Sequence, residues 1–400
     1  NYLAFAMPVF FLFVYIEYYL AKRNRKAGLF KYESSVSNIS VGIAERLINL
    51  FVATSFYGVF YWVYDNYRIF EIKESWLSWM VLILCTDLVW YWYHRLGHEV
   101  NLFWAAHIVH HQSEEFNLTA AARITTIQAF IRTFFWVLLP LAGFPPKMVI
   151  IMLLVHGAYS FFTHTQAVKR IKWLEYIFIT PSLHGVHHAS DEKYLDKNYG
   201  DMFVFWDKLF GTYQAEEEAP KYGLTHPIKS FSFLWQHFHY YFEIAESFQR
   251  AKTWRGKWNA IFGSPALMDQ SIRPELEKRF LQDRALKLQP LKFQGYITFQ
   301  VGLCVAMLSW FTYYYGQQHL SDKLFVGTFI LVTLVNCGAL LEQRRWVCYL
   351  EYARLMIVLT YLMYNEGYVE FIIFPFAILI AAEKLFSLAK HYHQFILQTK

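Results

Sequence analysis

Long apolar segments alternate with shorter polar connections over most of the chain. A helix needs roughly 20 mostly apolar residues to cross a bilayer. We therefore predict an all-α integral membrane protein with about seven to nine apolar helices. The pattern predicts the existence of these helices more firmly than it predicts where each one begins and ends. The nine candidate segments are residues 2–20, 41–63, 76–93, 124–142, 147–162, 293–315, 323–341, 348–364 and 369–386.

Two features interrupt this alternation. The fourth and fifth segments are short and are joined by GFPPK, in which Pro145 and Pro146 break the helical pattern, so a tight hairpin is predicted there. Residues 166–291 form the one long polar block. Within it, residues 231–258 mix aromatic with basic side chains, which fits either an interfacial amphipathic stretch that caps the membrane face or an ordinary domain surface.

The basic loops predict an orientation. The sequence KRNRK at Lys22–Lys26 follows the first span, and basic loops favour the cytoplasmic side of a membrane. Alternation from there places residues 94–123, 166–291 and 342–346 on that same cytoplasmic side. Because the first residue is Asn1, the sequence is taken to lack its true start, and no signal peptide is predicted.

Composition agrees with a membrane protein and argues against other classes. Of 400 residues, 56% are hydrophobic and 17% are charged, where soluble domains carry about a quarter charged residues. The net charge of +6 comes from basic residues between apolar segments, which fits lipid headgroups, and no nucleic-acid partner is expected. The four cysteines form no CxxC pair and are interpreted as packing residues.

Histidines provide the strongest chemical signal, because eight of the 16 fall into three short boxes. Residues at i, i+3 and i+4 share one face of a helix, so each box is expected to project two or three imidazoles in one direction. Eight converging nitrogen ligands are too many for one metal and suit two. Imidazole binds Zn, Cu, Fe and Ni, so the ligands alone do not name the metal. The boxes are His94 and His98; His107, His110 and His111; and His184, His187 and His188.

Four further polar residues are candidates for supporting roles. His164 ends the fifth segment on the side of the boxes and is expected to be a ninth ligand, with an interfacial residue as the alternative; His156, two turns earlier, is expected to be a core histidine. Asp87 lies two turns before His94 inside an apolar helix, where a charge is costly. It is expected to accept a hydrogen bond from a box-one histidine, with a helix-packing contact as the alternative. Asn198 is a candidate for a similar contact, or is a turn residue.

The ligand set separates several metal chemistries. A hydrolytic zinc site would need an HExxH-type carboxylate, which the sequence lacks, and a bis-histidine haem would need two axial histidines rather than triplets. A two-metal, all-nitrogen site beside a membrane fits iron-dependent activation of O₂ for attack on a lipid C–H bond. The neighbouring helices would offer an apolar slot for a long alkyl chain. A metal-binding transport or scaffold protein is an alternative of another class, which the scattered ionisable residues of the spans do not favour.

The spacing HxxxH, HxxHH, HxxHH resembles the membrane fatty acid hydroxylase/sterol desaturase superfamily. Longer runs are similar to its alkylglycerol monooxygenase branch, from about residue 38 to 258 and more loosely through the C-terminal helices. These runs are HRLGHEVNLFWAAHIVHHQSEEFNLTAAAR, TPSLHGVHH, DKNYG, WDKLFGTYQAEEE and YGLTHPI.

This resemblance implies a diiron enzyme that uses O₂ together with tetrahydrobiopterin or another diffusible reductant. It would hydroxylate the ether-bearing carbon of an alkylglycerol, which then yields a fatty aldehyde and glycerol. Hydroxylation or desaturation of a sterol, sphingolipid or acyl chain is the alternative, because the superfamily shares one site among these reactions. The sequence has no haem-binding domain, iron–sulfur cysteines or dinucleotide fingerprint, which favours a diffusible reductant or a separate reductant-regenerating protein.

The resemblance also assigns residues and regions. It implies the eight box histidines and His164 as iron ligands, and Glu114 as a contact for the pterin or for protons of the site, with a helix-surface acid as the alternative. It implies an endoplasmic reticulum membrane in a eukaryote or an inner membrane in a bacterium, with the site on the cytoplasmic side. The predicted parts are N-terminal membrane helices (1–75), a catalytic domain (76–260), a polar linker (261–290) and C-terminal membrane helices (291–400).

Overall fold

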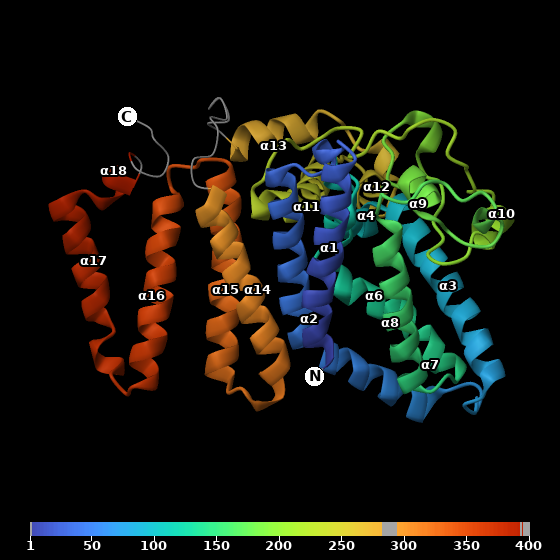
Figure 1. Cartoon of the computed structure of the whole chain (residues 1–400), viewed down its shortest axis with the longest axis horizontal. Helices are drawn as coiled ribbons and strands as arrows, with labels where there is room; N and C mark the ends of the chain where they lie inside the picture. Colours follow the sequence, from blue (N-terminus) through green and yellow to red (C-terminus); the bar gives the residue numbers. More distant parts are fainter. Residues whose placement is uncertain (1, 282–293, 393, 395–400) are drawn as a thin grey trace.

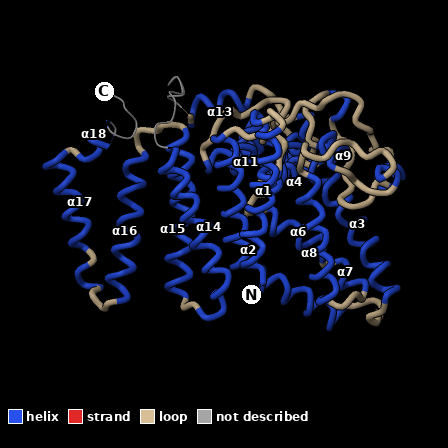
Figure 2. The backbone as a smooth tube through the Cα atoms, in the orientation of Figure 1, coloured by secondary structure: helices blue, strands red, loops and turns tan. Residues whose placement is uncertain are grey.

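A computed structural model describes residues 2–281, 294–392 and 394 of the chain. The regular elements of this part are helices, and Figure 2 shows most of them as upright rods beneath one layer of loops. By length and composition, five are able to cross a membrane. The protein is therefore an all-helical integral membrane protein, as predicted. The five cover Ala27–Ala53, Pro146–Thr163, Gln294–Gln317, Leu320–Leu341 and Val347–Asn365.

The first two long helices run in opposite directions (Figure 1). After the short η1 (Tyr2–Phe5), α1 (Ala6–Arg23) rises from the lower face in Figure 1 to the loop layer. The turn η2 (Ala27–Leu29) leads into α2 (Tyr32–Tyr67), which descends again. The α1–α2 connection therefore lies in the same layer as the histidine-bearing elements.

Two helices carry the chain back up to this layer. α3 (Trp76–Glu99) is capped by Ser75, whose hydroxyl oxygen accepts from the Ser78 N–H. α8 (Pro146–Thr163) begins with a proline, at a position where the N–H would have no partner within the helix. They pack together around a buried core that includes Leu82, Met148 and Met152. Their upper ends hold box one and His164.

The fourth predicted span, residues 124–142, is not one helix. It comprises α6 (Gln128–Trp136) and α7 (Leu138–Ala142), which meet at Val137. Pro140 has no N–H to bond the carbonyl one turn earlier, which explains the interruption. The predicted hairpin at GFPPK is present, because Gly143 ends α7 with φ of 113° and Pro146 begins α8.

The polar block, together with residues 101–121, forms a cap of helices and loops over the membrane helices (Figure 1). α11 packs on α2, α4 and α15, so residues 233–250 are an integral part of this cap. Residues 265–281, predicted as linker, form η6 and α13, and α13 packs on α11 through Ile272 and Leu276; residues 282–290 lie outside the described residues. The cap helices are α4 (Asn101–His107), η3 (Ile108–Gln112), α5 (Leu118–Ala121), η4 (Leu174–Tyr176), α9 (Pro181–His187), η5 (Glu192–Tyr194), α10 (Phe205–Phe210), α11 (Phe233–Arg250), α12 (Trp254–Phe262), η6 (Pro265–Leu267) and α13 (Ile272–Phe280).

The C-terminal helices form a second membrane unit beside α2. α14 and α15 pack on α2 around buried side chains such as Leu47, Ile330 and Leu334, whereas α16 and α17 extend outward to the far edge in Figure 1. These elements are α14 (Gln294–Tyr314), η7 (Tyr315–Gln317), α15 (Leu320–Leu341), α16 (Val347–Asn365), η8 (Val369–Phe371), α17 (Ile373–Phe386) and α18 (Leu388–Tyr392).

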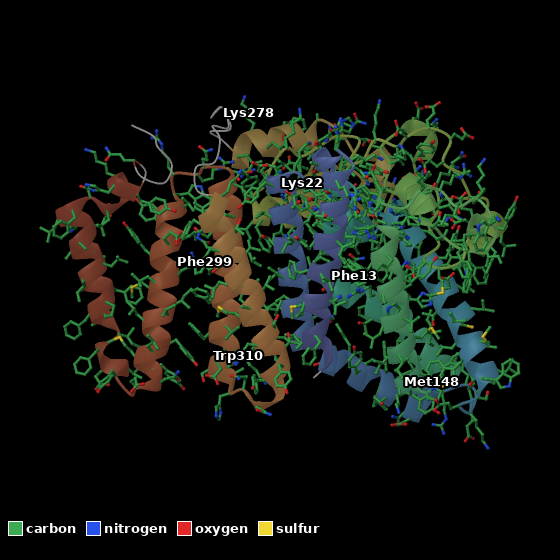
Figure 3. The ribbon with its side chains drawn as sticks, in the orientation of Figure 1. Phe13, Lys22, Met148, Lys278, Phe299 and Trp310 are labelled. Atoms are coloured by element: carbon green, nitrogen blue, oxygen red, sulfur yellow. The ribbon has the colours of Figure 1, made fainter. Side chains whose placement is uncertain are left out.

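The polar segments lie on one side of the helices, as the loop pattern predicts. Lys22 and Lys278 mark the upper face in Figure 3, and Met148 and Trp310 lie toward the opposite end. The elements that carry the histidine boxes lie at the same upper end (Figure 1). That this face is cytoplasmic stays a prediction.

Candidate metal centre

Nine histidines, from four separate stretches of chain, meet at the junction between the membrane helices and the cap. They form two groups, and within each group the nearest ring nitrogens lie within 4.8 Å of one another. The five-histidine group consists of His94, His98, His107, His111 and His187; the four-histidine group consists of His110, His164, His184 and His188. The structure thus brings together all nine histidines that the sequence singles out, including His164.

Each HxxHH box is divided between the groups. In box two, His107 and His111 belong to the five-histidine group and His110 to the other; in box three, His184 and His188 share the four-histidine group and His187 belongs to the other. On a helix with 3.6 residues per turn, the first and last histidines of a box are four residues apart and point in nearly the same direction. The histidine between them, three residues after the first, is rotated to the other side of that direction. The expectation that a whole box points one way was therefore too simple.

The rings are oriented by backbone carbonyls through their Nδ1 atoms. His94 Nδ1 lies 2.9 Å from Tyr199 O, and His187 Nδ1 lies 2.9 Å from Lys197 O. In the four-histidine group, His110 Nδ1 contacts Arg123 O at 3.2 Å, and His164 Nδ1 contacts Ser160 O at 2.7 Å. A carbonyl only accepts, so each of these Nδ1 atoms carries the proton of the neutral ring.

This tautomer leaves Nε2 lone pairs facing each other. His164 Nε2 lies 3.1 Å from His110 Nε2, although neither of these neutral rings has a proton there to share. In the other group, the buried Nε2 atom of His187 has no hydrogen-bond partner among the described residues. Converging lone pairs need a cation, so the donor set fits metal ions.

Burial keeps these rings neutral. Eight of the nine are 8% exposed or less. Desolvation lowers the pKa of His164 to about 4. Desolvation, then neighbouring imidazoles, lower the pKa of six others well below the usual range: His107, His110, His111, His184, His187 and His188. Neutral imidazole is the form that binds metals.

Comparison with known proteins identifies the family. The model of the fatty acid hydroxylase family matches residues 79–212, which contain all nine histidines. Human alkylglycerol monooxygenase is 32% identical over 350 residues, covering 84% of this chain and 77% of the human protein. The chain belongs to the alkylglycerol monooxygenase family. The Danio rerio alkylglycerol monooxygenase is 30% identical, covering 91% and 82% of the two chains.

A more distant relative matches about a third of the chain. The ornithine lipid hydroxylase OlsE of Rhizobium tropici is 32% identical over 128 residues, 31% of this chain and 38% of that protein. No solved structure matches the chain. Membership of the alkylglycerol monooxygenase family makes this protein a membrane-embedded oxidoreductase that acts on lipid, as the histidine pattern predicts.

Asp87 does not play the predicted role in this family member. Among the described residues, its carboxylate accepts from the N–H groups of Met202 and Phe203, at 2.8 and 3.1 Å, and lies 3.7 Å from His156 Nδ1. It therefore contacts the loop after box three, whereas in box one His94 Nδ1 contacts Tyr199 O and His98 Nδ1 lies 3.8 Å from Asp196 Oδ1. His156 is fully buried, as predicted, and also pairs with Asp201 at 2.8 Å.

Asn198 is a turn residue, the second of its two predicted readings. It adopts φ of 54°, its side-chain nitrogen donates to Leu183 O and Gln214 O, and its oxygen accepts from Gln214 N. Within the described chain, its partners are these backbone groups rather than an imidazole. It holds the loop against the start of box three, so its effect on His184 is indirect.

The acidic pair after box two is divided by burial. Glu114 is exposed and packs over Gly223, whereas Glu115 is 7% exposed and forms a 2.5 Å ion pair with Lys31. The structure therefore places Glu114 at the surface of the cap. No sequence pattern distinguishes it from the neighbouring Glu115.

Arg123 supports the histidine site through its hydrogen bonds, and it is not identified from the sequence. Its buried guanidinium donates to neutral oxygens of Ser37, Asn38, Gln112, Gln236 and Val109. Desolvation lowers the pKa of this group to about 9. Since Arg123 O also orients His110, one residue ties box two to α2 and α11.

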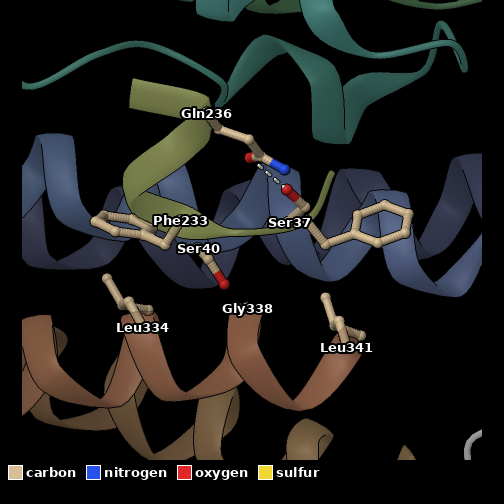
Figure 4. Close-up of a pocket in the computed structure, with 8 residues that line it drawn as sticks. Ser37, Ser40, Phe233, Gln236, Leu334, Gly338 and Leu341 are labelled. Atoms are coloured by element: carbon tan, nitrogen blue, oxygen red, sulfur yellow. Dashed lines mark hydrogen bonds between the residues drawn. The ribbon is translucent and has the colours of Figure 1, made fainter. Parts of the chain in front are cut away.

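A cavity of about 10 Å³ lies beside this network, between α2, α11 and α15 (Figure 4). Ser37 donates to Gln236 at its edge, at 2.8 Å, and Ser40 Oγ has no partner among the described residues. The volume suits one water molecule, which Ser40 would bind. It is too small for lipid, so this cavity is a packing feature of the Arg123 network.

Proposed function

We propose that the protein is a diiron monooxygenase that cleaves the ether bond of alkylglycerols. The observation that carries this proposal is the pair of adjoining histidine groups, whose unprotonated Nε2 atoms converge at the end of the membrane helices. The family relationship supports the substrate class, because the full-length relatives are named for alkylglycerol. Bound iron would supply the activation of O₂ that an unactivated C–H bond requires.

The protein residues prepare this chemistry in three ways. Carbonyls hold the ring orientation of His94, His110, His164 and His187, so the Nε2 atoms are positioned before any ligand arrives. Burial keeps the imidazoles neutral and able to bind metal. The helices beneath the site present apolar side chains to the bilayer, which suits a lipid whose alkyl chain stays in the membrane.

The proposed reaction inserts one oxygen atom of O₂ into the C–H bond of the carbon next to the ether oxygen. The other oxygen atom leaves as water, with two electrons from the reductant and two protons. The hydroxylated carbon then bears two oxygens and collapses to a fatty aldehyde and glycerol. We further propose tetrahydrobiopterin, or another diffusible reductant, as the electron source and exposed Glu114 as a contact for it on the cap.

The orientation of the chain is part of the proposal. The face that carries the sites also carries Lys22 and the other basic residues of the first loop, which supports a cytoplasmic location. The membrane would be the endoplasmic reticulum in a eukaryote or the inner membrane in a bacterium. There a soluble partner could regenerate the reductant.

Metal analysis and a product assay test this function together. We expect two iron atoms per chain, and release of a fatty aldehyde from alkylglycerol with ¹⁸O₂ and tetrahydropterin. His110→Ala should abolish aldehyde release, whereas His319→Ala, at an exposed histidine, should not. A stable alcohol or a new double bond instead of aldehyde would assign another lipid hydroxylase or desaturase. Purified protein without metal, or full activity of His110→Ala, would reject the diiron proposal.

A further inference from the structure

Two aromatic rings lie over the four-histidine group. The ring centroid of Phe116 lies 5.2 Å from that of His188, 5.7 Å from His164 and 6.2 Å from His184. Tyr222 stacks on Phe116, with centroids 4.8 Å apart and planes 12° apart. Phe116 is 1% exposed, whereas Tyr222 is partly exposed. From the surface inward, the order is therefore Tyr222, Phe116 and the imidazoles.

The position of Phe116 is fixed by the segment that follows His164. Gln166 Nε2 donates to Phe116 O at 3.0 Å. The buried carboxylate of Glu17, on α1, accepts from Leu118 N at 2.8 Å and from Thr165 Oγ1 at 2.5 Å. The same contacts thus hold the ring and the segment after the histidine beneath it, and they connect both to the first helix.

Tyr222 is fixed by the segment after box three. It forms an antiparallel bridge with Ala189, and Ser190 N donates to Lys221 O at 2.7 Å. A methyl group on Gly185 would lie 3.2 Å from the Tyr222 hydroxyl and 3.7 Å from Phe116. Glycine inside box three therefore allows both rings to close over the helix that carries the ligands.

We propose that Phe116 and Tyr222 form an aromatic cover that excludes water and small solutes from the four-histidine group. The proposal rests on the proposed function, in which the Nε2 atoms beneath the cover hold metal. An apolar ring at this position strengthens electrostatic interactions inside the site and limits side reactions with water. Among the described residues, the histidines in ring contact with Phe116 all belong to the four-histidine group, so the cover protects that group specifically.

Chemical labelling of the full-length protein in nanodiscs tests this cover without catalysis. After chelation of metal, diethyl pyrocarbonate modifies accessible imidazoles, and peptide mass spectrometry gives a rate for each histidine. Phe116→Ala and Tyr222→Ala should speed modification of His184 and His188 by about tenfold or more, because access no longer waits for a local opening. The rate at His98, in the five-histidine group, should stay unchanged.

Matched variants separate the cover from general loss of packing. Phe116→Leu and Tyr222→Phe retain an apolar side chain or a ring and should label as the parent protein does. Phe311→Ala removes an equally buried ring from the C-terminal helices, where it packs on Phe51 and Tyr315, and should leave His184 and His188 protected. In protein that carries iron, the release of iron to a water-soluble chelator should be faster in Phe116→Ala and Tyr222→Ala, but not in Phe311→Ala.

Equal labelling of His184 in the parent and in Tyr222→Ala would overturn the proposal. So would faster labelling of all nine histidines, or the same increase in Phe311→Ala, because the effect would then be global loosening. If Phe116→Ala does not fold, the pair Tyr222→Ala and Tyr222→Phe decides the question at the partly exposed ring. Absence of aldehyde formation by the parent protein would contradict the proposed function and leave the labelling result intact.

Discussion

Acid should unfold the metal-free protein unusually steeply, because many imidazoles must remain neutral in the folded state. Burial lowers the pKa of His164 to about 4 and that of six other rings of the two groups well below the ordinary value. An unfolded histidine titrates near pH 6.5. Since the folded pKa lies below the unfolded pKa, the unfolded state binds more protons as the pH falls through about 6.5. The contribution of these neutral rings to the free energy of unfolding is therefore complete above that pH and is lost progressively below it. For His164 the loss continues down to its folded pKa of about 4.

The expected loss is large. At about pH 5.5, one histidine that stays neutral in the fold and titrates normally when unfolded lowers the free energy of unfolding by about 1.4 kcal/mol. The six rings whose pKa is lowered beside His164 act in the same direction, so the total loss should exceed that of His164 alone. Bound metal competes with protons for the same nitrogens, so the metal-loaded protein should withstand a lower pH.

Melting temperatures of chelated and iron-loaded protein in one detergent, from about pH 8 to about pH 5.5, measure this effect. His164→Gln removes one of the seven groups, so its acid-induced loss should be smaller by about 1.4 kcal/mol at about pH 5.5. His319→Gln, at an exposed histidine, should follow the parent curve. A melting temperature that stays constant over this range, or an equal change in both variants, would refute the reasoning.

Three further substitutions test the supports of the site. Arg123→Lys replaces a side chain that makes five hydrogen bonds by one with three N–H bonds, so at least two buried acceptors lose their donor. We expect about 2–6 kcal/mol of destabilisation in thermal melting. The control Arg250→Lys, on the surface, should change the melting little. Asp87→Asn turns an amide NH₂ toward one of the two N–H donors and should cost about 1–3 kcal/mol, with loss of iron by elemental analysis; unchanged iron and melting would contradict this. Gly42→Ala places a methyl group 2.7 Å from Ala122 O and should destabilise by about 1–3 kcal/mol, whereas Gly58→Ala, on the same helix with no neighbour within 4 Å, should be neutral in the same melt.

Much of this protein is predictable from local patterns in the sequence. Apolar runs of sufficient length predict the membrane helices, and the hairpin at Pro145 and Pro146 follows from backbone chemistry alone. The eight box histidines are recognisable because ligands three or four residues apart lie near one another on a helix. His164 follows from its place at the end of α8, on the side of the boxes.

The supports of the histidines are not predictable in this way. The groups that accept from Nδ1 are mostly backbone carbonyls, such as Tyr199 O and Arg123 O, and every residue type has one. The sequence predicts that Asp87 contacts a box-one histidine, because it is a charged residue in the same apolar helix. Its carboxylate instead accepts from two backbone N–H groups 115 and 116 residues away in the sequence. Long-range pairing of this kind depends on how the cap folds back over α3, which no local spacing encodes.

Because boxes two and three each contribute to both histidine groups, the positions of the two groups are coupled. α9 is seven residues long, yet it carries His184 for one group and His187 for the other, and His188 follows directly. Box two is divided in the opposite sense at the junction of α4 and η3, with His110 opposed to His107 and His111. A shift of either segment therefore moves ligands of both groups together, in directions that one helix turn fixes. Two independent metal sites would need no such interleaving, whereas a reaction shared by two metals requires their separation to be held constant.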